Sequence, residues 1–150
     1  MKEIKEMIDM LMEQATDIRK EWSAAIDSVV HNKPKFIKRT RDRMWFSNLE
    51  TMKEILAAYN FTAKKFIEDD GSVTLSLNEI DLVENAPNED EARKLLGSAI
   101  LDYAEEYYEN YEMYSRAPNR KKHIPYIFKA LIMDNTKEIG DSIQCQDGEN

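Results

Sequence analysis

The strongest constraint on this chain is a long stretch of helical periodicity that follows Pro87. Asn88 can cap a helix there, because its side chain can accept a hydrogen bond from a free amide of the first turn. Acidic residues at 89–91 then lie where a helix terminus is positive. Apolar side chains recur at helical spacing, at Ala92, Leu95, Leu96, Ala99, Ile100, Tyr103, Ala104, Tyr107, Tyr108 and Tyr111. The sequence therefore predicts one long helix.

This helix is also a candidate binding surface. Its other face is acidic, with Asp102, Glu105, Glu106, Glu109 and Glu112. A tyrosine-rich stripe is typical of a core or of an interface between proteins, and phenol hydroxyls favour a partly wet surface. We predict that a partner protein contacts this acidic helix through Tyr103, Tyr107, Tyr111, Glu105 and Glu109.

A β-hairpin is predicted before the long helix. Residues 72–77 alternate apolar and polar side chains, which is the period-two pattern of a half-buried strand. An Asp-Gly pair at positions 70 and 71 separates them from a second strand at 61–68. The hairpin therefore has an acidic turn.

The region after the long helix begins with a basic connector over residues 115–123. A helix over 124–133 follows, in which Pro125 fits only the first turn. Asn135 and Glu138 can start a last short helix that ends near residue 143. Residues 144–150 are predicted to form a flexible tail.

The N-terminal part of the chain contains two predicted helices. The first covers residues 2–11, with one apolar face made of Ile4, Met7, Ile8 and Leu11. After a brief extended segment at 12–15, Thr16 can cap the second helix, which carries apolar residues up to Val29. Pro34 ends it, because a proline disfavours helical backbone at the residue before it.

A second hairpin follows, with short strands at 35–38 and 44–47 and a turn through 39–43. Ser47 and Glu50 form a capping-box pattern, in which each side chain bonds the backbone amide of the other residue. The helix that they would open stops before Tyr59.

The turn of this hairpin is basic in a chain of formal net charge −8. Nucleic-acid phosphates explain such a local reversal of charge, because each neutralised phosphate releases condensed counterions. The alternative is a solvated edge whose charges prevent aggregation. On composition alone the two explanations are equal. The cations of the run are Lys33, Lys35, Lys38, Arg39, Arg41 and Arg43.

The predicted helices and hairpins together make an α+β protein. The length fits one ordinary domain, or two small subdomains that share a core. The chain has 150 residues, of which 42% are hydrophobic and 33% charged. No stretch reaches the roughly 18 apolar residues that cross a bilayer, and the N-terminus lacks the features of a signal peptide. A single cysteine, Cys145, allows no disulfide within the chain. We therefore expect a cytoplasmic protein with no membrane partner.

No catalytic, metal or cofactor site is predicted. The two histidines are 92 positions apart in sequence, at His31 and His123, and one cysteine cannot build a usual zinc cluster. The four glycines are scattered and form no phosphate-binding loop. Glu68, Asp69 and Asp70 could hold a divalent metal in a nuclease-like enzyme, although a hairpin turn is the simpler explanation. We favour a binding protein over an enzyme.

One known family shares this order of elements. The segments ATDIRKEWSAAIDSVV, KPKFIKR and MWFSNLETMKEIL resemble the N-terminal module of the Phd/YefM antitoxins of bacterial toxin–antitoxin systems. In that family the module forms a dimer and presents basic residues to operator DNA. The resemblance places Arg19 and Arg39 at positions where the family uses arginine on DNA, with Lys35, Lys38, Arg41 and Arg43 beside them.

The second half resembles the C-terminal half of antitoxin-like proteins related to the RelB/HicB group, over SVTLSLNEIDLVENAPNEDEARKLLGSAILDYAEEYY. This resemblance implies a small basic partner, a toxin of the RelE type, which is an mRNA interferase. The expected organisation is a DNA-binding and dimerisation module over 1–58 with an extra N-terminal helix, a partner-binding region over 59–143 and a tail over 144–150.

The resemblance implies a homodimeric antitoxin that neutralises its toxin and represses its own operon. A stand-alone interaction or scaffold protein, with the same fold but no DNA or toxin binding, is the alternative.

Overall fold

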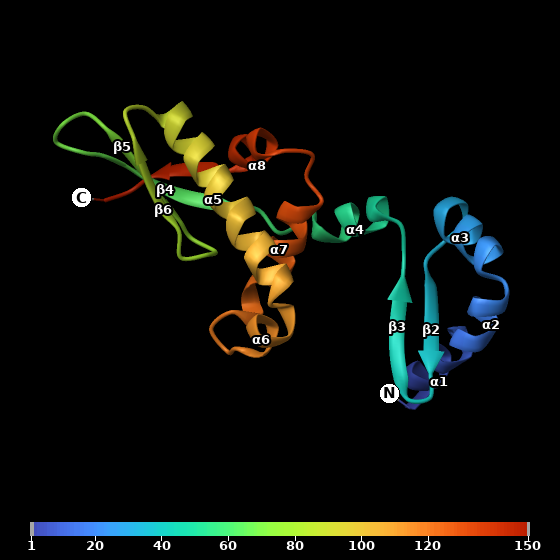
Figure 1. Ribbon diagram of the computed structural model, residues 1–150. Coiled ribbons are helices and arrows are strands. Elements are labelled where there is room, and N and C mark those ends of the chain that lie inside the picture. Colours follow the sequence, from blue (N-terminus) through green and yellow to red (C-terminus); the bar gives the residue numbers. More distant parts are fainter. Residues whose placement is uncertain (1, 150) are drawn as a thin grey trace. The chain divides into compact units, whose positions relative to one another are not determined.

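The computed structural model describes residues 2–149, and the side chains of residues 6–149. Runs of strands and runs of helices follow one another along the chain, which confirms the predicted α+β class (Figure 1). The chain divides into two compact units, residues 1–55 and residues 56–150, which we call unit 1 and unit 2. Each unit has its own sheet and its own buried cluster. The expectation of one shared core is therefore wrong.

Unit 1 is built on a three-stranded sheet. Its elements are α1 (Lys2–Leu11), β1 (Met12–Gln14), α2 (Ala15–Lys20), α3 (Trp22–His31), β2 (Lys35–Arg39) and β3 (Asp42–Phe46). The strands lie in the order β1-β2-β3, with β1 parallel and β3 antiparallel to β2. α4 (Leu49–Leu56) then runs across the boundary between the units. The predicted basic hairpin is confirmed as the β2–β3 pair.

The helix predicted at the N-terminus is confirmed as α1. Its apolar face is not buried in the chain, because Met7 and Leu11 are 64% and 57% exposed. The side chain of Ile4, which belongs to the same predicted face, lies outside the described side chains.

Two predicted helix starts in unit 1 are wrong. α2 begins directly after β1, so Gln14 is the residue before the helix and Thr16 lies inside it. The predicted second helix is also broken at Glu21, whose ψ of 45° separates α2 from α3. α4 begins one residue later than the predicted capping box requires. Asn48 therefore caps it, and its Oδ1 accepts from the Thr51 amide at 2.9 Å.

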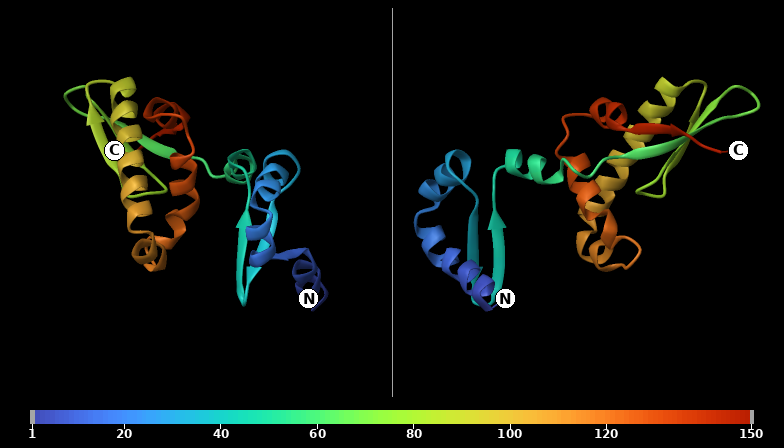
Figure 2. Two further views of the ribbon diagram at one scale, coloured as in Figure 1. Left: turned by 45° about the vertical axis from the view of Figure 1, so that its right-hand side comes forward. Right: turned by 180° about the vertical axis from the view of Figure 1, so that it is seen from behind.

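Unit 2 combines a four-stranded sheet with helices that pack against it (Figure 2). Its elements are β4 (Thr62–Ile67), β5 (Val73–Leu77), β6 (Val83–Ala86), α5 (Glu89–Glu109), α6 (Tyr111–Arg116), a 3-10 turn (Lys121–His123), α7 (Ile124–Leu131), α8 (Thr136–Ser142) and β7 (Gln144–Asp147). The strand order is β6-β5-β4-β7, and only the β4–β7 pair is parallel. The predicted acidic-turn hairpin is confirmed as β4–β5, whereas β6 was not predicted.

The predicted long helix is confirmed as α5, and its cap is as expected. The Asn88 side chain accepts from the Glu91 amide at 2.9 Å, and Asn135 does the same for Glu138 at 2.8 Å at the start of α8. α5 lies across the centre of the unit 2 core. The core residues from α5 are Ala92, Leu96, Ile100, Ala104 and Tyr107, all fully buried.

Two glycines let α5 and α8 approach closely. A Cβ added at Gly97 would lie 2.6 Å from the carbonyl oxygen of Thr136, and one added at Gly140 would lie 2.7 Å from the carbonyl oxygen of Arg93. Both distances are too short for a side-chain carbon, so this helix pair requires glycine at both positions.

The C-terminal segment is a strand rather than the predicted tail. β7 pairs with β4, and the backbone amides of Gln144 and Gly148 donate to the carbonyl oxygens of Phe61 and Lys65 at 2.9 and 2.8 Å. The signal for this strand lies in its partner β4, not in the local polar sequence. Residue 150 of the predicted tail lies outside the described residues.

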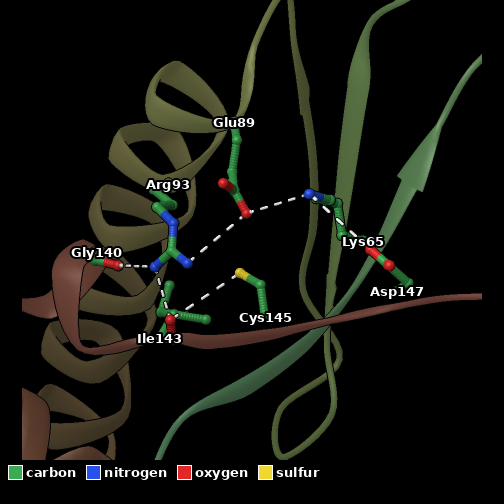
Figure 3. A network of polar contacts seen from close by, with 7 residues as sticks. All are labelled: Lys65, Glu89, Arg93, Gly140, Ile143, Cys145 and Asp147. Carbon is green, nitrogen blue, oxygen red and sulfur yellow. Dashed lines mark hydrogen bonds and ion pairs between the residues drawn. The ribbon is translucent and has the colours of Figure 1, made fainter.

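A polar network fixes the start of β7 (Figure 3). The Arg93 guanidinium donates to the carbonyl oxygens of Ile143 and Gly140 at 2.6 and 3.2 Å. Glu89 lies 3.7 Å from Arg93 and 3.8 Å from Lys65. Burial, the largest cause, raises the pKa of the Cys145 thiol beside this network. These contacts join α5, α8, β4 and β7.

Candidate nucleic-acid and partner-binding surfaces

The turn of the β2–β3 hairpin places a cation at its tip. Arg39 and Asp42 are the last pair in register, so Thr40 and Arg41 form a two-residue turn. Thr40 has a φ of 57°, in the left-handed region that such turns use. Arg41 is therefore fully displayed at the end of the hairpin, and its side chain is exposed.

The hairpin cations lie on both faces of the sheet. Ile37 is 8% exposed and packs with residues of α2 and α3, so its face is the covered one. Arg39 lies two residues further along β2 and shares that face, because side chains alternate along a strand. Lys38 and Arg43 are paired in register and lie on the opposite face.

Arg19 lies on the covered side of the sheet, at the edge of an apolar groove. The groove has a volume of about 480 Å³ and is lined by Ala15, Ile18, Arg19, Trp22, Ile37 and Met44. Arg19 and Arg39, the two arginines that the family resemblance singles out, therefore belong to the same side of unit 1.

Three of the predicted DNA-binding cations already have acidic partners. Lys35 pairs with Glu13 at 2.9 Å, and Arg43 pairs with Asp9 at 2.7 Å. Arg39 lies 3.6 Å from Asp42 in an exposed pair, which water weakens. Among the described side chains, ion pairs are absent at Arg19, Lys38 and Arg41.

The predicted partner-binding residues of α5 separate into buried and exposed ones. Tyr107 is fully buried, and its hydroxyl donates to the carbonyl oxygen of Arg120 at 2.8 Å. Tyr107 is therefore a core residue, unavailable to a partner in this fold. Tyr103 is half-buried, with its hydroxyl 2.8 Å from Nδ1 of His123. Glu105 and Glu109 are exposed, as predicted for a surface.

The tyrosine that the predicted contact set omits is Tyr108, which is 61% exposed. Tyr108 and Tyr111 flank the Phe128 ring of α7, with centroid distances of 6.5 and 5.8 Å. Periodicity alone does not separate Tyr107 from Tyr108, because both positions continue the buried series of α5 from Ala92 to Ala104 at helical spacing. Tyr107 is the buried one, and its hydroxyl donates to the carbonyl oxygen of Arg120.

The two units differ in charge. Residues 1–55 contain 11 Lys and Arg against 10 Asp and Glu, whereas residues 56–150 contain 10 against 19. Unit 1 therefore has a net charge of +1 and unit 2 a net charge of −9. The acidity of the chain belongs to unit 2.

A cavity of about 500 Å³ lies in unit 2 between the β5–β6 loop and the segment before α7. His123 borders it and is only 8% exposed. Burial, the largest cause, lowers the pKa of His123, with smaller effects from Lys122 and Arg120. On the facing loop, Glu79 accepts from the amide and the hydroxyl of Thr62.

The acidic turn of the β4–β5 hairpin serves the turn itself. Asp70 accepts from the Ser72 amide at 2.9 Å, and hydrogen bonds to Ser72 hold its pKa below the usual value. Gly71 has a φ of +84°, which the turn requires. Within the described part of the chain, no three His, Cys, Asp or Glu side chains are placed to hold a metal ion. The nuclease alternative thus finds no support at Glu68, Asp69 and Asp70.

None of the helices in residues 2–149 is both long enough and apolar enough to span a membrane.

The family model for antitoxins of RelE/RelB toxin–antitoxin systems, of the PHD-like type, matches residues 9–145. Among curated proteins there is no match. A crystal structure from Syntrophomonas wolfei subsp. wolfei, described as the antitoxin part of a proposed toxin/antitoxin system, superposes with a TM-score of 0.87 at 34% identity. The match covers 91% of this chain and 99% of that one. These matches confirm the resemblance seen in the sequence, and the chain belongs to the family of RelE/RelB-type antitoxins.

Proposed function

We propose that this antitoxin neutralises a small basic toxin, an mRNA interferase of the RelE type, and represses its own operon by binding operator DNA as a homodimer. The observation that carries this proposal is the division of charge between the two units, +1 against −9. Complementary potentials steer partners together and suppress wrong ones. Unit 1 suits a polyanion, and unit 2 suits a basic protein.

Unit 1 is the DNA-binding half. None of the described acidic side chains forms an ion pair with Arg19, Lys38 or Arg41. Arg39 has only a long and exposed partner, which phosphate can displace. Lys35 and Arg43 are held by Glu13 and Asp9, so they contribute less. Arg19, Arg39, Arg41 and Lys38 are therefore the main contacts.

The homodimer forms through unit 1. Phe36 and Trp45 are paired in register on the sheet face opposite Ile37, and they are 37% and 38% exposed. Two exposed aromatic rings side by side on an open sheet face are typical of a surface that a second copy covers. A dimer presents two basic hairpins to DNA, which requires an operator with two half-sites.

Unit 2 is the toxin-binding half. Glu105 and Glu109 supply the acidic face of α5, and the exposed ring of Tyr108 lies beside them on the same helix, with Tyr111 as its neighbour. Tyrosine and carboxylate side chains together suit lysine and arginine, through ion pairs and cation–π contacts. Tyr108 replaces the buried Tyr107 in this set, and Tyr103 contributes only its exposed edge.

DNA binding is tested by fluorescence anisotropy with the promoter fragment of the chain's own operon over a salt series. The double variant Lys38→Ala, Arg41→Ala should weaken binding by at least tenfold and reduce the salt slope by about two, because each phosphate contact contributes about 0.9. Lys53→Ala, an exposed cation on α4, is the matched control. Absence of salt-dependent binding by the wild type would refute this half.

Toxin binding is tested by co-expression with the adjacent open reading frame. The wild-type protein should relieve the growth defect that the toxin causes and should co-purify with it. Glu105→Lys with Glu109→Lys should abolish both effects. Glu68→Lys with Asp69→Lys makes the same charge change at an exposed turn of unit 2 and should leave both intact. If the adjacent open reading frame encodes a toxin and the wild-type protein does not relieve its growth defect, the result would argue for the scaffold alternative.

A further inference from the structure

The cavity beside His123 is not used by the proposed DNA or toxin contacts. One wall is the loop from Asn78 to Leu82, and the other is the segment from Asn119 to His123, with Tyr103 between them. All of these residues belong to unit 2. A volume of about 500 Å³ falls in the range of roughly 300–1,000 Å³ that small-molecule sites occupy.

His123 presents a ring nitrogen to this cavity. Its Nδ1 lies 2.8 Å from the Tyr103 hydroxyl. Burial is the largest cause that raises the pKa of this phenol, so Tyr103 keeps its proton and can donate it to Nδ1. In that tautomer the neutral ring carries its hydrogen on Nε2. Nε2 has no hydrogen-bond partner among the described residues. None of the polar side-chain atoms in the described residues is both fully buried and without a partner, so Nε2 must be accessible. Nε2 is therefore open to the cavity that its residue lines.

Arg120 is a second donor that is held in place without an acidic partner. Its guanidinium lies 4.0 Å from the ring centroid of Tyr114 and 5.8 Å from that of Tyr103. The Tyr107 hydroxyl anchors the Arg120 carbonyl oxygen. No described carboxylate makes an ion pair with Arg120. A hydrogen bond to Tyr114, the largest cause, raises the pKa of Arg120, with a smaller effect from the charge of Glu106. The other N–H groups of the planar guanidinium remain for an oxyanion.

The remaining charges around the cavity divide between its walls. Lys122 adds a second cation beside Arg120 and the neutral ring of His123. On the loop, both oxygens of Glu79 are occupied by the amide and hydroxyl of Thr62. Asp81 is exposed on the same loop and accepts no hydrogen bond from a described residue. The donors thus cluster on one wall, and a single free acceptor faces them.

We propose that this cavity binds a small ligand through a phosphoryl group, whose oxygens accept hydrogen bonds from Arg120, Lys122 and Nε2 of His123. Asp81 is placed to accept from a hydroxyl group of the same ligand, as acidic residues do with ribose. A mononucleotide has both chemical groups, and inorganic phosphate has the first alone. The antitoxin would then carry a ligand site in the unit that we assign to toxin binding.

The test is a titration of the full-length protein with inorganic phosphate and with adenosine monophosphate at constant ionic strength, followed by NMR and calorimetry. Saturable shifts should appear in the amides of residues 78–82 and 119–123. Tighter binding of the nucleotide identifies a nucleotide site, whereas equal binding identifies a phosphate site. No saturable shift with either probe up to about 10 mM would overturn the proposal.

Three variants make the test specific. Arg120→Gln should weaken binding by about tenfold or more, the usual effect of losing a hydrogen bond to a charged group. Lys121→Gln makes the same charge change one residue away but outside the cavity lining, and should change affinity less than twofold. Asp81→Asn removes the facing negative charge and should tighten phosphate binding severalfold.

Equal weakening by Lys121→Gln and Arg120→Gln would show non-specific attraction and refute the site. Asp81 is exposed, so Asp81→Asn is expected to fold. This variant therefore tests the site even if substitutions of the buried His123 prevent folding. These measurements use neither DNA nor toxin, so they can fail while the proposed function stands, and the reverse also holds.

Discussion

Unit 1 and unit 2 differ most in how much apolar surface each buries within its own residues. The unit 1 cluster consists of Ile18, Ala25 and Ile37, with Ala15 and Phe46 packed against it. Among the side chains of residues 6–149, ten large apolar ones of unit 1 are exposed, against seven in unit 2, although unit 2 is the longer unit. Unit 2 therefore has an extensive buried core of its own, whereas unit 1 has a small one and leaves more apolar side chains exposed.

The chain contains its own probes for this comparison. Both tryptophans, Trp22 and Trp45, lie in unit 1, and all seven tyrosines lie in unit 2. Trp22 stacks on Phe46 with a centroid distance of 5.6 Å. Tryptophan fluorescence therefore follows the packing of unit 1, and the near-ultraviolet signal of tyrosine follows unit 2.

The largest effect is expected for Ile100→Ala, in the middle of the unit 2 core. Ile100 is fully buried on α5. Removing its methylene and methyl groups leaves a cavity and should lower the free energy of unfolding of unit 2 by about 2–5 kcal/mol. Urea denaturation followed by tyrosine circular dichroism should show this loss, while the tryptophan transition keeps its midpoint. A parallel shift of both transitions would contradict the independence of the units.

A smaller effect is expected for Gly97→Ala at the contact between α5 and α8. The added carbon would lie 2.6 Å from the Thr136 carbonyl oxygen and 2.9 Å from the Gly140 backbone nitrogen, so the two helices must separate. We expect a loss of about 1–3 kcal/mol, as for other overpacked sites. The measurement is the tyrosine transition in urea. The control is Ser98→Ala, an exposed neighbour on α5, which should leave stability nearly unchanged.

Several local features of the two units could be predicted from the sequence, because they depend on residues close together in the chain. Asn88 and Asn135 were predicted as helix caps, since a cap needs only the amide three residues further on. The β2–β3 and β4–β5 hairpins were predicted for the same reason. β7 was missed because its partner β4 lies about 80 residues earlier.

The candidate sites were predicted only where they depend on residues close together in the chain. The basic hairpin was located from charge alone. Its ion pairs depend on Asp9 of α1, 34 positions from Arg43, and on Glu13 of β1, 22 positions from Lys35. Periodicity gave the apolar side of α5 and could not separate Tyr107, which the connector covers, from Tyr108, which it leaves exposed. The His123 cavity brings together residues from distant segments, and the sequence gives no local signal for it.

A second copy that covers unit 1 would make the stability of this unit depend on protein concentration. If the homodimer forms through Phe36, Trp45 and neighbouring apolar residues, the stability of unit 1 depends on protein concentration. Each tenfold dilution should then lower the free energy of the tryptophan transition by about 1.4 kcal/mol, while the tyrosine transition of unit 2 stays constant. Phe36→Ser should weaken the dimer in sedimentation equilibrium, and Ile67→Ser, an exposed apolar residue of unit 2, serves as control. A tryptophan transition that is independent of concentration would argue against the homodimer.

The smallest expected effect is a pH dependence confined to unit 2. Burial first, and then the nearby charges of Lys122 and Arg120, hold the pKa of His123 below its usual value, with Glu79 and Asp81 on the facing loop. Below about pH 6.5, the normal histidine pKa, the unfolded chain binds a proton at this position that the folded chain does not. The stability of unit 2 should therefore fall as the pH is lowered from 7.5 through the depressed pKa of the folded state, since the unfolded state then binds more protons. Urea titrations of the tyrosine signal at pH 7.5 and 5.5 measure this loss, and His123→Gln should reduce it. If His123→Gln loses as much stability on acidification as the wild type, the pH dependence belongs to other groups. A stability that rises on acidification would contradict the buried, neutral state of His123 in the wall of the cavity.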